Sequence, residues 1–153
     1  MIIHRSWAES SELEILEDWV LDIAFRPVPK WLGDFSFKYG MTLPTEIASV
    51  ATRLSTLCST QAFNTTFVQR YEIGQSVKSH RDPCTNLADT LILCFGTFTG
   101  AETKVNGQLA GQLRRGDVGQ LPCFKGGVQG PRHEVSAVTS GTRFALILNT
   151  IVK

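Results

Sequence analysis

A histidine and an aspartate, His80 and Asp82, stand one residue apart in the segment VKSHRDPCTN, residues 77–86. Residues i and i+2 of a strand point to the same face, so both side chains could reach one metal ion. Non-haem iron(II) oxygenases bind their metal with two histidines and one carboxylate, which leaves coordination positions open for co-substrate and oxygen. The pair therefore predicts a metal site that needs one more histidine from elsewhere in the chain.

The chain offers only two further histidines, His4 and His133. His133 opens a strand-like run late in the sequence, where it could fold back beside the His80 strand. Arg143 follows within the otherwise apolar run TRFALIL. A buried arginine is costly unless it meets an anion, and a dicarboxylate co-substrate is such an anion. Each of these residues alone usually has a structural role, but their order and spacing together predict a site.

Two helices are expected to precede this region. In residues 11–25, Ser11 and Glu14 form a capping-box pattern, and a second helix is expected to begin near Pro44. Apolar residues recur at helical spacing in both segments. The two stripes are Leu13, Leu16, Val20 and Ile23, then Ile47, Val50, Ala51, Leu54, Leu57 and Cys58. Both stripes indicate core packing.

From Phe63 onward the pattern changes to short β-rich runs, separated by Gly, Pro, Asn and Asp. The runs are TTFVQRY, TLILCF, TKV, QLAGQL, DVGQLP, HEVSAV and RFALILNTIV. Several short strands after two helices predict an α+β domain, with a sandwich or barrel packed on the helices.

Length and composition are those of one globular domain: 153 residues, of which 42% are hydrophobic and 19% charged. The sequence contains no run of about 18 apolar residues, which a membrane span would require. Its N-terminus resembles neither a signal peptide nor a transit peptide. The four cysteines, Cys58, Cys84, Cys94 and Cys123, are widely spaced. We interpret them as reduced thiols of a soluble intracellular protein, with no obligate protein partner indicated.

The formal net charge of +1 argues against strong electrostatic binding of nucleic acid. A local basic patch is still consistent with the sequence, because one third of the chain contains Arg114, Arg115, Lys125 and Arg132. The alternative is that these residues are ordinary solvated charges.

With these residues in view, the sequence resembles the iron(II)- and 2-oxoglutarate-dependent oxygenases, and among them the AlkB-like family. The resemblance covers residues 31–149, about three quarters of the chain. It rests on WLGD (31–34), FKYG (37–40), LP (43–44), FNTTFVQRYEIGQSVKSHRD (63–82), LRRGDV (113–118) and GTRFALILN (141–149).

The resemblance implies a double-stranded β-helix, or jelly roll, flanked by two N-terminal helices. It implies that His80, Asp82 and His133 bind Fe(II), and that Arg143 holds the distal carboxylate of 2-oxoglutarate. Tyr71 would hydrogen-bond to this co-substrate, which reacts with O2 at the iron.

The sequence departs from the family pattern at three places. Gln69 and Asn149 stand where the family has an asparagine and a second arginine, so both positions are assigned to co-substrate binding with an altered mode. Pro83-Cys84 follows the H-x-D pair, where repair enzymes often have acidic residues.

As a function, the resemblance implies oxidative demethylation of alkylated bases in single- or double-stranded DNA or RNA, with the base flipped out of its stack. Tyr39, Phe37 and Trp31 are expected to stack on that base, or else to pack at the jelly-roll edge. One alternative is hydroxylation of a 5-methylpyrimidine, a protein side chain or a small molecule, since the pattern from His133 to Arg143 is shared with prolyl-hydroxylase-like oxygenases. Another is a non-catalytic jelly-roll binding module.

Overall fold

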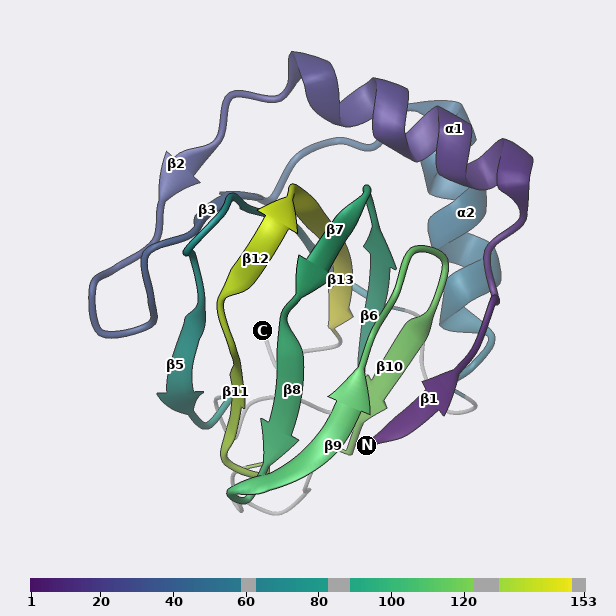
Figure 1. Cartoon of the computed structure of the whole chain (residues 1–153). Coiled ribbons are helices and arrows are strands. Elements are labelled where there is room, and N and C mark those ends of the chain that lie inside the picture. Colours follow the sequence, from purple (N-terminus) through teal and green to yellow (C-terminus); the bar gives the residue numbers. More distant parts are fainter. Residues whose placement is uncertain (59–62, 83–88, 123–129, 150–153) are drawn as a thin grey trace.

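The computed structural model describes residues 1–58, 63–82, 89–122 and 130–149 (Figure 1). The helices are α1 (Ser10–Trp19), a short 3-10 helix (Val20–Asp22) and α2 (Thr45–Ser55). The strands before His133 are β1 (Ile2–His4), β2 (Arg26–Pro27), β3 (Ser36–Tyr39), β4 (Thr65–Tyr71), β5 (Val77–His80), β6 (Thr90–Phe95), β7 (Phe98–Gly100), β8 (Glu102–Val105), β9 (Gln108–Gln112) and β10 (Val118–Leu121). The last three are β11 (His133–Val135), β12 (Val138–Gly141) and β13 (Arg143–Asn149).

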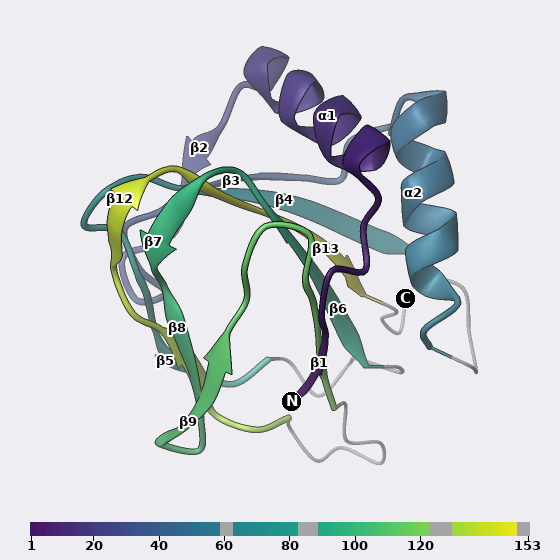
Figure 2. The same cartoon turned by 45° about the vertical axis from the view of Figure 1, so that its right-hand side comes forward.

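The strands form two facing sheets. A seven-stranded major sheet has the order β1-β10-β6-β13-β4-β3-β2, and a minor sheet has the order β5-β11-β8-β9, extended by the pair β12-β7. Within the described ranges every pairing is antiparallel. Figure 2 shows α1 and α2 on the outer face of the major sheet, away from the minor sheet. The predicted α+β double-stranded β-helix, flanked by two N-terminal helices, is confirmed.

The central strands β6 and β13 are buried on both faces, which explains their nearly continuous apolar sequences. In β13, Leu146 and Leu148 point outward and pack with α1 and α2, where Leu16 and Leu54 are fully buried. The alternate residues of the same strand, beginning with Arg143, line the space between the sheets. The helix stripes read from the sequence are therefore core, and the inner sheet face stays available for a site.

The helix α1 begins differently from the expectation for Ser11 and Glu14. Glu9 is the N-cap residue, and its backbone N–H donates to the Glu12 carboxylate at 2.9 Å. The same carboxylate accepts a hydrogen bond from Arg53 Nε of α2 at 3.0 Å. The predicted cap is wrong by two residues, because Glu12 serves both the helix start and the contact between the two helices.

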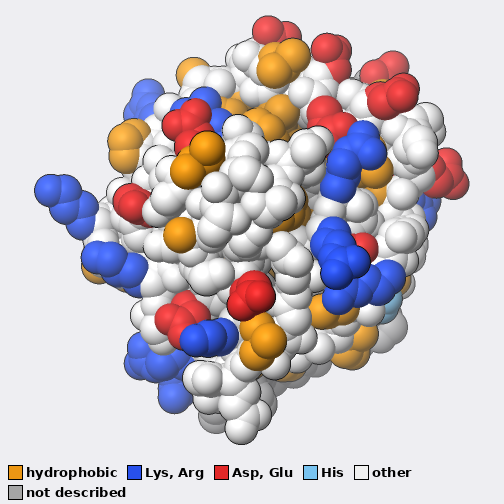
Figure 3. All heavy atoms as spheres, in the orientation of Figure 1, with side chains coloured by type: hydrophobic (Ala, Val, Ile, Leu, Met, Phe, Trp, Pro, Cys, Tyr) orange, Lys and Arg blue, Asp and Glu red, His pale blue; other side chains and the backbone are white. Residues whose placement is uncertain are grey.

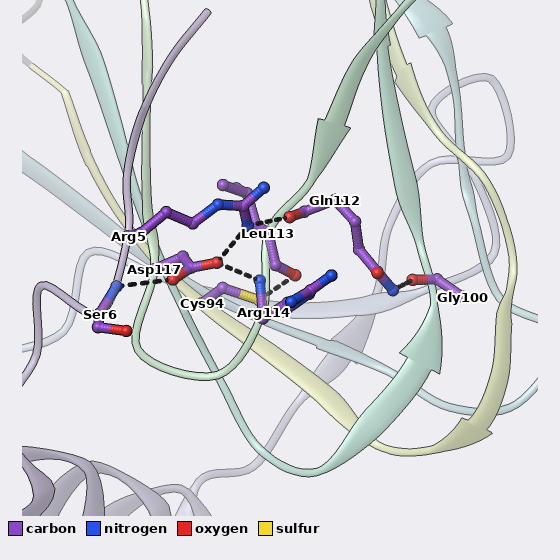
Figure 4. A network of polar contacts seen from close by, with 8 residues as sticks. All are labelled: Arg5, Ser6, Cys94, Gly100, Gln112, Leu113, Arg114 and Asp117. Atoms are coloured by element: carbon purple, nitrogen blue, oxygen red, sulfur yellow. Dashed lines mark hydrogen bonds and ion pairs between the residues drawn. The ribbon is translucent and has the colours of Figure 1, made fainter.

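The N-terminal segment is fastened to the turn between β9 and β10 through Asp117, which is only 3% exposed (Figure 4). Its carboxylate accepts hydrogen bonds from Arg5 Nη1 at 2.6 Å, from the Ser6 N–H at 2.8 Å and from the Arg114 N–H at 2.9 Å. Burial would raise the pKa of Asp117, but these donors and the Arg5 charge outweigh it and hold the pKa below its usual value.

We expect Asp117→Ala to lower the free energy of unfolding by about 1–3 kcal/mol at neutral pH, because two partly buried backbone donors lose their charged acceptor. Urea denaturation measures this, with Asp18→Ala, an exposed acid of α1, as a control that changes little. Because the folded-state pKa of Asp117 is lowered, its contribution is present at neutral pH and is lost as pH falls through that pKa. The difference between wild type and variant should therefore shrink in acid. Equal stabilities at neutral pH would contradict the role given to this carboxylate.

Two further expectations from the sequence concern a membrane span and the state of the cysteines. No helix in the described part of the chain is long and apolar enough to cross a membrane. Cys58 and Cys94 are free thiols, while Cys84 and Cys123 lie outside the described residues.

Candidate active site

A cavity of about 600 Å³ lies between the two sheets. The period of two along β4 and β13 determines which side chains of the major sheet face it. The lining residues from these strands are Thr65, Phe67, Gln69, Tyr71, Arg143, Ile147 and Asn149. The minor sheet contributes His80 and His133, flanked by Val77 and Val135. Residues far apart in the sequence thus share one enclosed space.

The structure brings the three predicted metal ligands together. His80 ends β5, His133 begins β11, and the two residues are direct partners in the antiparallel register. Asp82 Oδ1 lies 3.5 Å from His80 Nε2 and 3.8 Å from His133 Nε2. One ligand atom from each of the three residues falls within 4.8 Å of the other two.

The geometry corrects one step of the sequence argument. Asp82 does not lie on the same strand as His80, because β5 ends at His80 and the chain continues without regular structure. The carboxylate reaches the two imidazoles from the segment just beyond the strand. The i, i+2 rule for strands therefore predicted correctly that His80 and Asp82 are neighbours, although Asp82 is not part of a strand.

Both imidazoles are oriented by backbone carbonyls. His80 Nδ1 lies 2.8 Å from the Lys78 oxygen, and His133 Nδ1 lies 3.0 Å from the Pro131 oxygen. A carbonyl oxygen can only accept a hydrogen bond, so Nδ1 carries the proton in each ring. In the neutral rings Nε2 then has a free lone pair on the side of Asp82, as a metal-binding histidine requires.

The electrostatics of this cluster, here called the metal triad (His80, Asp82 and His133), suit a divalent cation. Burial raises the pKa of Asp82, but its contacts with the two histidines outweigh burial and hold that pKa below its usual value. Burial lowers the pKa of His133 and so favours the neutral, ligating form. For His80, burial acts in the same direction, but contacts with Asp82 and the Lys78 carbonyl outweigh it and raise the pKa.

The metal triad passes a simple test of fit. The Nε2–Oδ1 separations of 3.5 and 3.8 Å are longer than the 2.7–2.9 Å typical of a charge-assisted hydrogen bond. The three groups thus face one another without pairing closely. Two neutral imidazoles and one carboxylate are the donor set that suits non-haem iron(II).

Arg143 is a second unusual group in the cavity. Its side chain is 2% exposed, its Nε lacks a hydrogen-bond partner, and no ion pair of the described residues includes it. The guanidinium lies over the Tyr71 ring, with its carbon 4.8 Å from the ring centroid, and it contacts the Cys94 thiol. A buried cation without a carboxylate partner fits an anionic ligand such as one carboxylate of 2-oxoglutarate.

Tyr71 and Gln69 form a pair beside this cation. The Tyr71 hydroxyl donates to Gln69 Oε1, and both side chains line the cavity. Burial raises the pKa of Tyr71, so the phenol keeps its proton and remains a donor.

Asn149 lies six residues from Arg143 on the same face of β13, about 20 Å farther along the strand. Thr90 Oγ1 donates to its Oδ1 at 2.7 Å, and the Asn64 N–H donates to its backbone oxygen at 3.0 Å. Thr90 and Phe67 also line the cavity but were missed from the sequence. The period-two alternation of β4 and β6 is the signal that would have found them.

The three aromatic residues expected to touch substrate lie together at the cavity. Trp31 is 66% exposed, Tyr39 is 51% exposed, and Phe37 is half-buried. All three line the cavity, and the ring of Tyr39 packs on Phe67 with centroids 4.8 Å apart. We call Trp31, Phe37 and Tyr39 the aromatic rim. The structure brings it to the metal triad's cavity, whereas Pro83-Cys84 lies outside the described residues.

No family model and no curated protein sequence matches the chain. Solved structures do match. An oxidoreductase of the 2OG-Fe(II) oxygenase family from Burkholderia pseudomallei aligns over 97% of this chain and 83% of its own, with 17% identity and a TM-score of 0.69. A prolyl-4-hydroxylase from Pseudomonas putida aligns over 99% of this chain and 92% of its own, with 10% identity and a TM-score of 0.72. The protein named OsALKBH1 aligns over 97% of both chains, with 13% identity and a TM-score of 0.67.

These likenesses concern the fold, since sequence identity is 17% or less in all three. The chain has the double-stranded β-helix fold of 2OG-Fe(II) oxygenases whose names indicate different activities.

Proposed function

We propose that residues 1–153 form one domain of an Fe(II)- and 2-oxoglutarate-dependent dioxygenase. One observation carries this proposal: a cavity holds both the metal triad and Arg143, a buried cation without an acidic partner in the described part of the chain. A metal site alone would suit many proteins. A metal site combined with a separate anion site suits a co-substrate that has a carboxylate at each end.

His80, Asp82 and His133 would hold the iron. When bound, Fe(II) with 2-oxoglutarate and O2 supplies an oxidative decarboxylation coupled to hydroxylation of a C–H bond. Arg143 would hold the distal carboxylate, with the protonated Tyr71 hydroxyl beside it. Gln69 orients Tyr71 through their hydrogen bond, and Asn149 offers a neutral amide where the related family has an arginine.

For the substrate, we infer an alkylated nucleobase in DNA or RNA, demethylated in the manner of the AlkB-like enzymes. The support is the aromatic rim, whose exposed Trp31 and Tyr39 offer stacking surfaces at the cavity. A base inside a duplex or stack has to leave it to reach the cavity, and exposed aromatic side chains lower the cost of doing so.

Hydroxylation of a protein side chain is the second candidate. It is favoured by the prolyl-4-hydroxylase of Pseudomonas putida, which superimposes on 99% of the chain. The same catalytic groups would serve either reaction, or a 5-methylpyrimidine or small-molecule substrate, so only the substrate test separates them. A non-catalytic binding module is the third candidate.

Succinate formation tests the reaction. The protein, loaded with Fe(II) without oxygen, is given 2-oxoglutarate and O2, with and without a pool of methylated oligonucleotides. We expect succinate in both samples, with more succinate and released formaldehyde when the pool is present. The unmethylated pool is the control and should give no formaldehyde.

The other outcomes point to the alternatives. Succinate that methylated oligonucleotides do not stimulate supports the oxygenase but removes the nucleic-acid substrate, and peptides containing proline are then the next probe. Iron binding without any succinate supports the binding module.

A further inference from the structure

Two arginines lie immediately beyond the paired histidines. Arg81 follows His80 at the end of β5, and Arg132 precedes His133 at the start of β11. Because His80 and His133 are partners in the antiparallel register, Arg81 and Arg132 adjoin the same end of this histidine pair. Both side chains are exposed.

Like charges held near each other repel unless an anion lies between them. No ion pair or side-chain hydrogen bond within the ranges that the structure describes includes Arg81 or Arg132. Other arginines of the chain do pair with acids. Those ion pairs are Arg5–Asp117, Arg53–Glu12 and Arg115–Glu17. Arg81 and Arg132 therefore differ from these three arginines in having no acidic partner among the described residues.

Their position relates them to the proposed site. Arg81 lines the cavity that holds the metal triad. Asp82, the residue after Arg81, has its carboxylate directed toward the two histidines.

The segment that carries Trp31 of the aromatic rim lies beside β5. The Lys78 N–H of β5 donates to the Leu32 oxygen at 2.8 Å, and Lys78 Nζ donates to the Lys30 oxygen at 2.9 Å. Trp31 stands between these two acceptors. Figure 3 shows basic side chains on the left and lower left of this face, over β5 and the lower ends of the minor-sheet strands. Cations and an exposed indole thus occur together beside the cavity.

We propose that Arg81 and Arg132 bind a backbone phosphate of a single-stranded nucleic acid, next to the nucleotide whose base enters the cavity. This rests on the proposed nucleic-acid substrate. A guanidinium matches a phosphate with two parallel hydrogen bonds, and a phosphate between the two arginines removes their repulsion. Single strands are held by such cations together with aromatic stacking, for which Trp31 and Tyr39 are placed.

The sequence suggested a basic patch, and the described members of that patch have different surroundings. The suggested members were Arg114, Arg115, Lys125 and Arg132. Arg115 is bound to Glu17 and behaves as a structural surface charge. Arg114 lies in the turn between β9 and β10, outside the cavity lining, and Lys125 lies outside the described residues. Among the described members of that group, Arg132 belongs with the phosphate site, and Arg81 joins it from a different part of the sequence.

Fluorescence anisotropy with a short labelled oligothymidine, titrated at several salt concentrations, tests the proposal on the full chain. The variants are Arg81→Gln, Arg132→Gln and the double variant. We expect affinity to fall roughly threefold to fivefold for each arginine. The slope of log affinity against log salt should become shallower by about 0.7 for each phosphate that the protein no longer neutralises. Arg114→Gln is the matched control, with the same charge change on another exposed arginine, and should leave both quantities unchanged.

A uniform loss of affinity and slope in all three single variants would overturn the proposal, because it would indicate net charge rather than a site. Unchanged binding in the double variant would overturn it too. Metal binding and succinate formation by the same variants keep this test separate from the proposed reaction. Succinate formed without oligonucleotide binding leaves the oxygenase and rejects the phosphate site. Salt-dependent binding that is lost in the double variant, by a protein that makes no succinate, supports the site and rejects the reaction.

Discussion

Replacing His133 by alanine should abolish specific binding of a divalent metal and, with it, succinate formation. The neutral Nε2 of His133 faces Asp82 at 3.8 Å, and its Nδ1 proton is already bonded to the Pro131 carbonyl. No other histidine stands near enough to replace it, because His4 bonds to Gln120 on the outer face of the major sheet. With one of three ligands missing, we expect metal affinity to fall at least about 100-fold.

His80→Ala and Asp82→Ala should have the same effect. Binding of Mn(II) by titration calorimetry measures it directly, without requiring turnover. His4→Ala is the matched control, since it removes the third histidine of the chain but leaves the cavity intact. Circular dichroism verifies that the variants stay folded.

Full metal affinity and turnover in His133→Ala would mean that the two histidines serve only to join β5 and β11. Loss of binding in His4→Ala as well would mean that the metal is held elsewhere or that folding is disturbed. Only a loss limited to the three residues of the triad agrees with our assignment.

How far the sequence predicted the structure depended on how each element is buried. The bounds of β4 and β6 were predicted correctly, because central strands are apolar on both faces and end at turn residues. The short strands β1, β2, β3 and β7 were missed, because two to four residues carry too little of the period-two alternation to be recognised. The run from His133 to Val138, which the sequence indicates as one strand, is divided into β11 and β12, because residues 136 and 137 belong to neither strand.

Some features of the candidate site could likewise be predicted from the sequence, and others could not. The order of His80, Asp82, His133 and Arg143 could be recognised in the sequence because the chain has only three histidines, and because Arg143 lies within an otherwise apolar run. The carbonyl partners of the two Nδ1 atoms could not be predicted, since any residue can supply a backbone oxygen. The placement of Arg81 and Arg132 beside the same histidine pair could not be predicted either, because it depends on strand register, which long-range pairing determines.

Replacing Arg143 by methionine should raise the KM for 2-oxoglutarate about 100-fold, while kcat at saturating co-substrate changes much less. A bidentate arginine–carboxylate contact in a buried site contributes to binding, and the distal carboxylate takes no part in the bond changes. Metal affinity should stay near that of wild type, because Arg143 does not belong to the metal triad. Arg143→Lys keeps the charge but loses the fork geometry, so we expect an intermediate KM.

Arg70→Met is the control that separates a ligand contact from a packing effect. Arg70 lies one residue before Tyr71 on β4, and its Nε is also buried without a partner, but its guanidinium packs on Phe25, and it does not line the cavity. This variant should alter stability without changing the KM for 2-oxoglutarate. In the absence of co-substrate, Arg143→Met should be as stable as wild type or more stable, because an uncompensated buried charge is removed. Added 2-oxoglutarate, with Mn(II) present, should raise the melting temperature of wild type and of Arg70→Met but not of Arg143→Met. An unchanged KM in Arg143→Met, or an equal melting shift in all three proteins, would remove Arg143 from the co-substrate site and leave its burial without a function.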